Sequence, residues 1–124
     1  MNYIYVMLGG AIGALMRYGV SRLCAGVTFL AMPAGTLVVN LLGCFLLGLL
    51  TGFAGLHTSL PRGLMLMLTV GMCGAFTTFS TFSAENVRMM ENGQALTALL
   101  YVTLSVVVGF LLFFLGKQIC SFFA

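Results

Sequence analysis

The side chains best suited to chemistry in this sequence are phenylalanines and hydroxyls gathered within residues 71–85. Phe76, Phe79 and Phe82 recur every three residues, so they fall on one flank of a helix. Beside them stand the hydroxyl side chains of Thr77, Thr78, Ser80, Thr81 and Ser83. An aromatic stripe alone usually reflects packing, but an apolar core does not explain so many hydrogen-bond donors in one segment. The pattern indicates a polar path.

Two other segments place polar side chains among apolar neighbours. One helical face is formed by residues spaced by four, namely Thr97, Tyr101, Ser105 and Gly109. Asn40 lies in the apolar run 35–43, where it either bonds to a neighbouring helix or offers its amide N–H to an anion. A narrow path lined by such uncharged donors suits an anion.

Other kinds of chemistry are disfavoured. His57 stands alone in a loop, and the sequence shows no pairing of nucleophile and base and no metal-ligand cluster. The cysteines have no C-x-x-C spacing and are interpreted as small packed residues rather than disulfide or metal ligands. A net charge of +3 without a basic patch argues against nucleic acid. We expect no enzyme, no nucleic-acid partner and no other protein partner.

The elements that must position these residues are membrane-spanning helices. The chain is 61% hydrophobic and 6% charged, whereas an ordinary soluble domain is roughly 25% charged. Its mean hydropathy is +1.17. Apolar stretches long enough to span a bilayer cover residues 3–23, 33–56, 63–84 and 95–115. The sequence predicts an all-α integral membrane protein, residues 1–124 forming one transmembrane domain.

Local sequence also predicts where these helices begin, weaken and approach each other. Prolines at 33 and 61 mark helix starts, and the polar residues 85–94 are interpreted as an interfacial link. Gly9 and Gly13 form a face for close helix approach. Glycines followed by adjacent threonines are poor helix formers, so the third helix is expected to break near its middle and free backbone carbonyls.

Orientation is weakly specified by charge. Lys and Arg in short loops normally face the cytoplasm, yet here Arg62 and Lys117 on one side oppose Arg17, Arg22 and Arg88 on the other. The chain therefore either inserts both ways, so that opposed copies meet as an antiparallel dimer, or is fixed by its first arginines. Arg17 itself either extends to the lipid headgroups or supplies a positive charge at a vestibule mouth.

Three segments closely resemble motifs of the Fluc (CrcB) family of fluoride channels. They are residues 9–18, 35–43 and 74–82, the last containing the sequence TTFSTF. The likeness covers nearly the whole chain. It implies a fluoride-selective passive channel in the bacterial inner membrane, crossing it several times, through which cells expel cytoplasmic fluoride. It further implies an antiparallel dual-topology homodimer with two pores.

The resemblance also implies roles for individual residues. The ring edges of Phe79 and Phe82 face the ion, and Asn40 donates to it. The remaining residues of the ion pathway are Ser80, Thr81, Tyr101 and Ser105. A structural Na⁺ is held at the dimer centre by the carbonyls of Gly74 and Thr77 from each subunit, and Arg17 belongs to the vestibule. Glu85 is placed in the vestibule or at an interface.

Two other functions are compatible with four short spans. A small multidrug exporter needs a membrane-embedded carboxylate for proton exchange, and the first three spans have none before Glu85 at an end. A scaffold subunit that transports nothing explains the faces of small residues but leaves the polar path unexplained.

Overall fold

The computed structural model describes residues 1–123, and four helical stretches in it are long and apolar enough to cross a membrane. These stretches are Asn2–Leu23, Ala34–Leu56, Arg62–Glu91 and Ala95–Phe122. The prediction of an all-α chain with four spanning segments is confirmed. In order, the elements are α1 (Asn2–Leu23), β1 (Thr28–Phe29), β2 (Met32–Pro33), α2 (Ala34–Leu56), α3 (Arg62–Leu66), the π-helix η1 (Met67–Cys73), α4 (Gly74–Phe76), α5 (Phe79–Glu91) and α6 (Ala95–Phe122).

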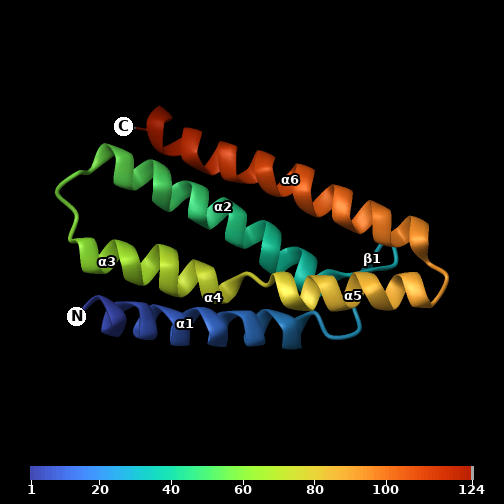
Figure 1. The fold of residues 1–124 in the computed structure, drawn as a ribbon. Helices are drawn as coiled ribbons and strands as arrows, with labels where there is room; N and C mark the ends of the chain where they lie inside the picture. The colour runs from blue at the N-terminus through green and yellow to red at the C-terminus, as the bar shows by residue number, and fades with distance from the viewer. Residues whose placement is uncertain (124) are drawn as a thin grey trace.

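The helices form two packed pairs that diverge at one end (Figure 1). α2 lies along α6, while α1 lies along η1 and α4. α5 continues the line of α3 and α4 toward the end where the β1–β2 hairpin lies, and both termini lie at the opposite end. The expected helix starts are confirmed, because Pro33 precedes α2 and Pro61 precedes α3.

Glycines set the distance between α1 and η1. A Cβ atom at Gly9 would collide with the carbonyl of Met67, and one at Gly13 with the carbonyl of Met72. The predicted close-approach face of the first helix is therefore confirmed. The segment in contact with it is wound as a π-helix, a form that usually occurs as a short bulge in an α-helix.

The third stretch has two extended residues between α4 and α5. Thr77 has φ −77° and ψ 156°, and Thr78 has φ −145° and ψ 121°. Helix α5 then runs from Phe79 through Glu91, so the interpretation of residues 85–94 as a link was wrong for most of that segment. The polar side chains occupy an amphipathic helix instead, and the chain turns only at Gly93, where φ is +76°.

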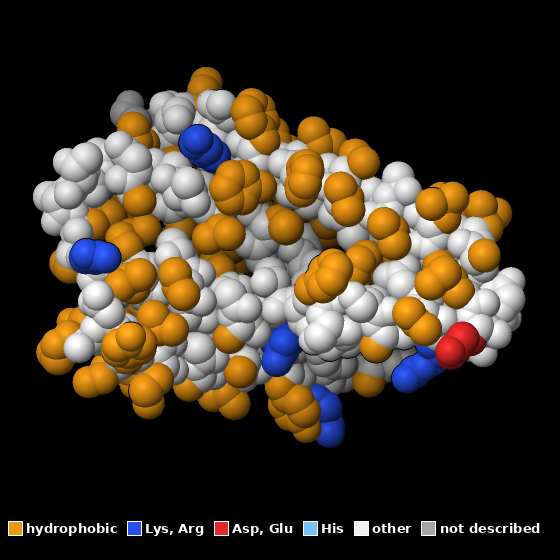
Figure 2. Space-filling model, in the orientation of Figure 1, with side chains coloured by type: hydrophobic (Ala, Val, Ile, Leu, Met, Phe, Trp, Pro, Cys, Tyr) orange, Lys and Arg blue, Asp and Glu red, His pale blue; other side chains and the backbone are white. Residues whose placement is uncertain are grey.

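The buried core sits at the hairpin end of the molecule. It consists of Met32, Leu37, Met89, Ala98 and Tyr101, with Met32 and Tyr101 fully buried. Most other large apolar side chains are exposed, and Figure 2 shows them spread over the visible face with few charges between them. An exposed apolar surface of this extent is what lipid contact requires.

Candidate functional site

Asn40 holds the extended residues between α4 and α5. Its Nδ2 donates to the carbonyl oxygen of Thr78 at 3.0 Å, and its Oδ1 accepts from the N–H of Thr78 at 2.8 Å. One amide thus satisfies both backbone groups of a residue whose extended conformation removes it from the helical pattern. The cross-helix bond was one of the two roles open for Asn40, and its amide nitrogen carries a second N–H besides.

The same local structure redirects the N–H groups that a continuous helix would use. In an unbroken helix the carbonyls of Gly74 and Thr77 would accept from the N–H groups of Thr78 and Thr81. Here Thr78 donates to Asn40, and Thr81 donates to the Oγ1 of Thr78 at 3.3 Å, which caps α5. The two carbonyls therefore lose their helical partners.

A cavity of about 300 Å³ lies beside this segment. Gly74 and Thr77 line it together with Asn40, Phe79 and others, and Gly74 is exposed. Carbonyl oxygens are the ligands that hard cations prefer. Gly74 is exposed and Thr77 is half-buried, so one copy of the chain does not fully enclose this pair of residues.

Aromatic rings form a continuous series from the surface to the core. The ring centroids of Phe79 and Phe82 are 6.0 Å apart, and those of Phe82 and Tyr101 are 4.8 Å apart. Phe79 is 79% exposed, whereas Tyr101 is fully buried. Ser105 follows one turn after Tyr101 on α6, and its Oγ is buried without a hydrogen-bond partner among residues 1–123. The structure therefore brings four of the predicted pathway residues onto two neighbouring helices.

The hydroxyls at the start of α5 divide into two groups. The Oγ1 of Thr77 donates to the carbonyl of Cys73 at 3.1 Å, and the Oγ1 of Thr78 serves as the helix cap. Ser80 and Thr81 are exposed instead. The Oγ of Ser80 lies 3.4 Å from the Oγ1 of Thr78, so an exposed hydroxyl stands next to the buried hydroxyl that caps α5.

Glu85 joins three helices through its carboxylate. Thr36 of α2 donates to Oε1 at 2.7 Å, and Tyr101 of α6 donates to Oε2 at 2.8 Å. Both donors are buried. Sequence reasoning gave Glu85 an uncertain role and did not single out Thr36. The sequence did contain a signal for this network, because an acidic side chain beside a membrane span needs hydrogen-bond donors for its carboxylate.

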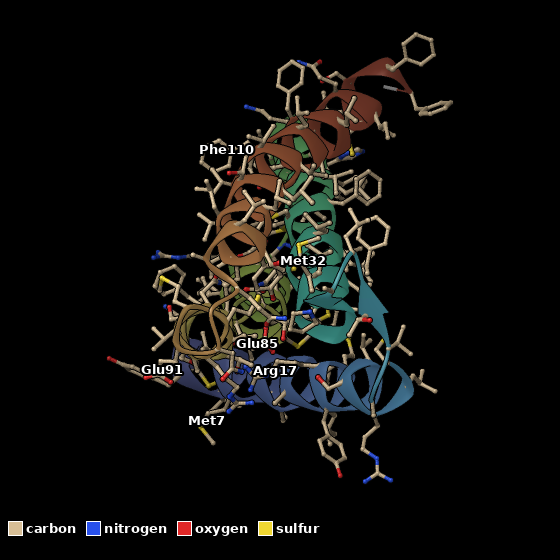
Figure 3. All side chains as sticks on the ribbon, turned by 90° about the vertical axis from the view of Figure 1, so that its right-hand side faces the viewer. Met7, Arg17, Met32, Glu85, Glu91 and Phe110 are labelled. Carbon is tan, nitrogen blue, oxygen red and sulfur yellow. The ribbon has the colours of Figure 1, made fainter. Side chains whose placement is uncertain are left out.

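Two cavities border this network. The larger, of about 490 Å³, is lined among others by Arg88, Glu85, Thr36 and Thr81. The smaller, of about 230 Å³, is lined by Arg17, Thr36 and Thr81 among others. Figure 3 looks onto this end, with Arg17 and Glu85 toward the middle of the view and Glu91 at the edge. Arg17 thus lines the smaller of the two cavities, and its vestibule role stays a prediction.

The sequence of this chain is similar to those of known proteins over nearly its whole length. A sequence model of the family described as "CrcB-like protein, Camphor Resistance (CrcB)" matches residues 4–117. A relative from Staphylococcus aureus (strain bovine RF122 / ET3-1), named "Fluoride-specific ion channel FluC 1", is 45% identical over 96% of this chain and 96% of its own. Proteins named "Fluoride-specific ion channel FluC" from Shewanella halifaxensis and Azobacteroides pseudotrichonymphae are 42% and 38% identical, each over 95% of this chain and 94% of theirs.

Proposed function

Because this chain belongs to the CrcB family, we propose that it is a fluoride-selective passive channel that lets cells expel cytoplasmic fluoride. The observation that carries the proposal is 45% identity, over 96% of both chains, to a protein named as a fluoride-specific ion channel. The chemistry of the site agrees with it. The polar groups along the candidate path are mostly uncharged donors, which can replace water around a small anion without trapping it.

The proposed pathway begins in the two cavities beside Arg88 and Arg17, the first of which is also lined by the hairpin. It passes the exposed hydroxyls of Ser80 and Thr81 and then the second amide N–H of Asn40. Farther along, the ring edges of Phe79 and Phe82 offer their electropositive rims, and Tyr101 and Ser105 complete the wall. The unpartnered Oγ of Ser105 supports this assignment, since a buried hydroxyl without a partner is costly unless something binds it.

The proposed channel is an antiparallel dual-topology homodimer with two pores. In one copy Phe79 is 79% exposed, and an ion-facing ring needs a second wall. Near-equal numbers of Lys and Arg on the two sides favour insertion in both orientations. The expected place of this assembly is the bacterial inner membrane.

The proposed role of the interrupted third helix is to create a structural Na⁺ site at the centre of that dimer. The carbonyls of Gly74 and Thr77 fit this role because their helical donors are bonded elsewhere. Two oxygens from one chain fall short of the roughly six that hard cations take. A second copy would bring the number of carbonyls to four and enclose the ion from both sides, so the ion and the dimer support each other.

A multidrug exporter is less well supported. Its carboxylate would have to be free to exchange protons, whereas both oxygens of Glu85 already accept hydrogen bonds from buried hydroxyls. No proton-coupled step is therefore proposed.

The decisive experiment is anion efflux from liposomes that contain only this protein. Fluoride release should be fast and chloride release indistinguishable from that of empty liposomes. Release of neither ion by protein that elutes as one species would refute the channel, and equal release of both would refute selectivity.

A further inference from the structure

The hairpin between α1 and α2 has an unusual turn. Its strands pair Thr28 with Pro33 and Phe29 with Met32, which leaves Leu30 and Ala31 as the two turn residues. Both are left-handed, with φ of 51° and 67°. Turns of this shape favour Asn-Gly or Asp-Gly, because a side chain such as leucine is sterically disfavoured there. The turn therefore carries backbone strain and has an apolar residue at its tip.

That tip is exposed while its base is fixed. Leu30 is 66% exposed, and Phe29 beside it is exposed by more than half. Met32, at the base, is fully buried in the core with Tyr101. The hairpin therefore presents its apolar end from a base that is packed into the core.

The flanking helices locate this apolar end at the membrane surface. α1 ends at Leu23 and α2 begins at Ala34, and both are long enough to span the bilayer. Residues 23–33 contain no charged side chain, so nothing in the hairpin opposes entry into the headgroup region. Water is the less favourable surrounding for the exposed apolar side chains of Phe29 and Leu30 at the tip.

A cationic and aromatic pair stands at the end of α1 next to the hairpin. The exposed guanidinium of Arg22 lies 5.9 Å from the centre of the Tyr18 ring, and its Nη1 donates to the Tyr18 hydroxyl at 3.4 Å. Tyrosine and arginine are the side chains that anchor proteins at the boundary of lipid and water. The positive charge complements lipid phosphates.

We propose that the hairpin is a membrane-interfacial anchor, with Phe29 and Leu30 inserted between the lipids of the leaflet where α1 ends and Arg22 at the phosphates. The inference does not depend on which ion the protein conducts. It has a structural consequence, since Thr28, Ala31 and Pro33 also line the 490 Å³ cavity. The leaflet thus supports one wall of that cavity.

The sequence contains no tryptophan, so Phe29→Trp introduces a single fluorescent probe at the tip. The variant is placed in vesicles of phosphatidylcholine and phosphatidylglycerol, with and without lipids brominated near the start of the acyl chain. We expect blue-shifted emission, loss of emission with the brominated lipids, and little quenching by aqueous acrylamide. Leu30→Trp is the second probe, should Phe29→Trp not elute as a single species.

Glu91→Trp is the matched control, because Glu91 is exposed at the end of α5 near the same end of the molecule. Its emission should be quenched by acrylamide and spared by brominated lipids. The anchor is refuted if the hairpin probes behave like the Glu91 probe, which places the tip in water. It is also refuted if neither quencher reaches the hairpin probes, which means that protein covers the tip.

Discussion

Removing the Asn40 amide should weaken both the protein and its conduction. In Asn40→Ala the carbonyl and the N–H of Thr78 lose their bonds at 3.0 and 2.8 Å in one step. The half-buried site lies within a membrane-spanning stretch, where water cannot readily replace the amide. An unsatisfied buried polar group costs about 1–3 kcal/mol, so two groups cost about 2–6 kcal/mol in the free energy of unfolding.

Conduction should fall for a separate reason. If the second N–H of Asn40 faces the ion, its loss leaves fluoride short of one donor, which costs about 1–3 kcal/mol at that point of the path. Each 1.4 kcal/mol added to a barrier slows passage about tenfold. We expect fluoride flux per folded protein to drop by about tenfold or more.

Asn86→Ala is the matched control. Asn86 is also a buried asparagine, but its Nδ2 donates only to the carbonyl of Phe82 one turn earlier in its own helix, at 2.8 Å. Its Oδ1 has no partner among residues 1–123, so truncation also removes an unsatisfied acceptor. A change in unfolding free energy well below that of Asn40→Ala is expected.

Both variants are measured by denaturant titration in detergent and by fluoride efflux from liposomes, normalised to protein that elutes like the parent. Equal unfolding midpoints for the two variants would contradict the idea that Asn40 stabilises the extended segment through its two bonds to Thr78. Parental flux through folded Asn40→Ala would remove its amide from the ion path, even if stability fell as expected.

Three further outcomes are expected. Phe79→Ile and Phe82→Ile keep size and apolarity but remove the ring edge, so each should abolish fluoride efflux without changing elution. Parental efflux in both variants would show that the two rings only pack against their neighbours. Exchange of Na⁺ for a bulky organic cation should reduce dimer content on cross-linking, and unchanged dimers would remove the ion from the structure. Tyr101→Phe should lower the unfolding free energy by about 1–3 kcal/mol, since it removes one of the two donors to Glu85 in a buried site; a parental unfolding midpoint would show that this bond contributes little.

The spanning helices were predictable because their signals are local. Apolar length and the prolines at 33 and 61 set the helix positions without reference to neighbours. The hairpin was not predicted, because Leu30 and Ala31 lack the usual turn residues. The π-helix was not predicted either, and it lies where glycines bring α1 close to it, a contact between residues far apart in sequence.

The site was predictable in its residue types but not in its pairings. Asparagine within an apolar run must find a partner, and that much follows from chemistry. The identity of the partner depends on tertiary structure, since Thr78 lies 38 positions away and the Thr36–Glu85 pair is separated by 49. For the same reason Thr36 was missed, because a hydroxyl at the start of a helix is usually explained by the helix itself.

The bonds that stabilise the extended residues between α4 and α5 are also the bonds that free the carbonyls of the proposed cation site. An extended Thr78 needs partners for its own N–H and carbonyl, and Asn40 supplies both. By taking that N–H, together with the capping of Thr81 by the Thr78 hydroxyl, the structure leaves the carbonyls of Gly74 and Thr77 without helical donors. In a continuous helix those carbonyls would accept hydrogen bonds from backbone N–H groups. Without the bonds from Asn40, the extended segment would lose its conformation. Asn40 therefore couples the stability of the fold to the proposed cation site, so a substitution that relaxes one must weaken the other.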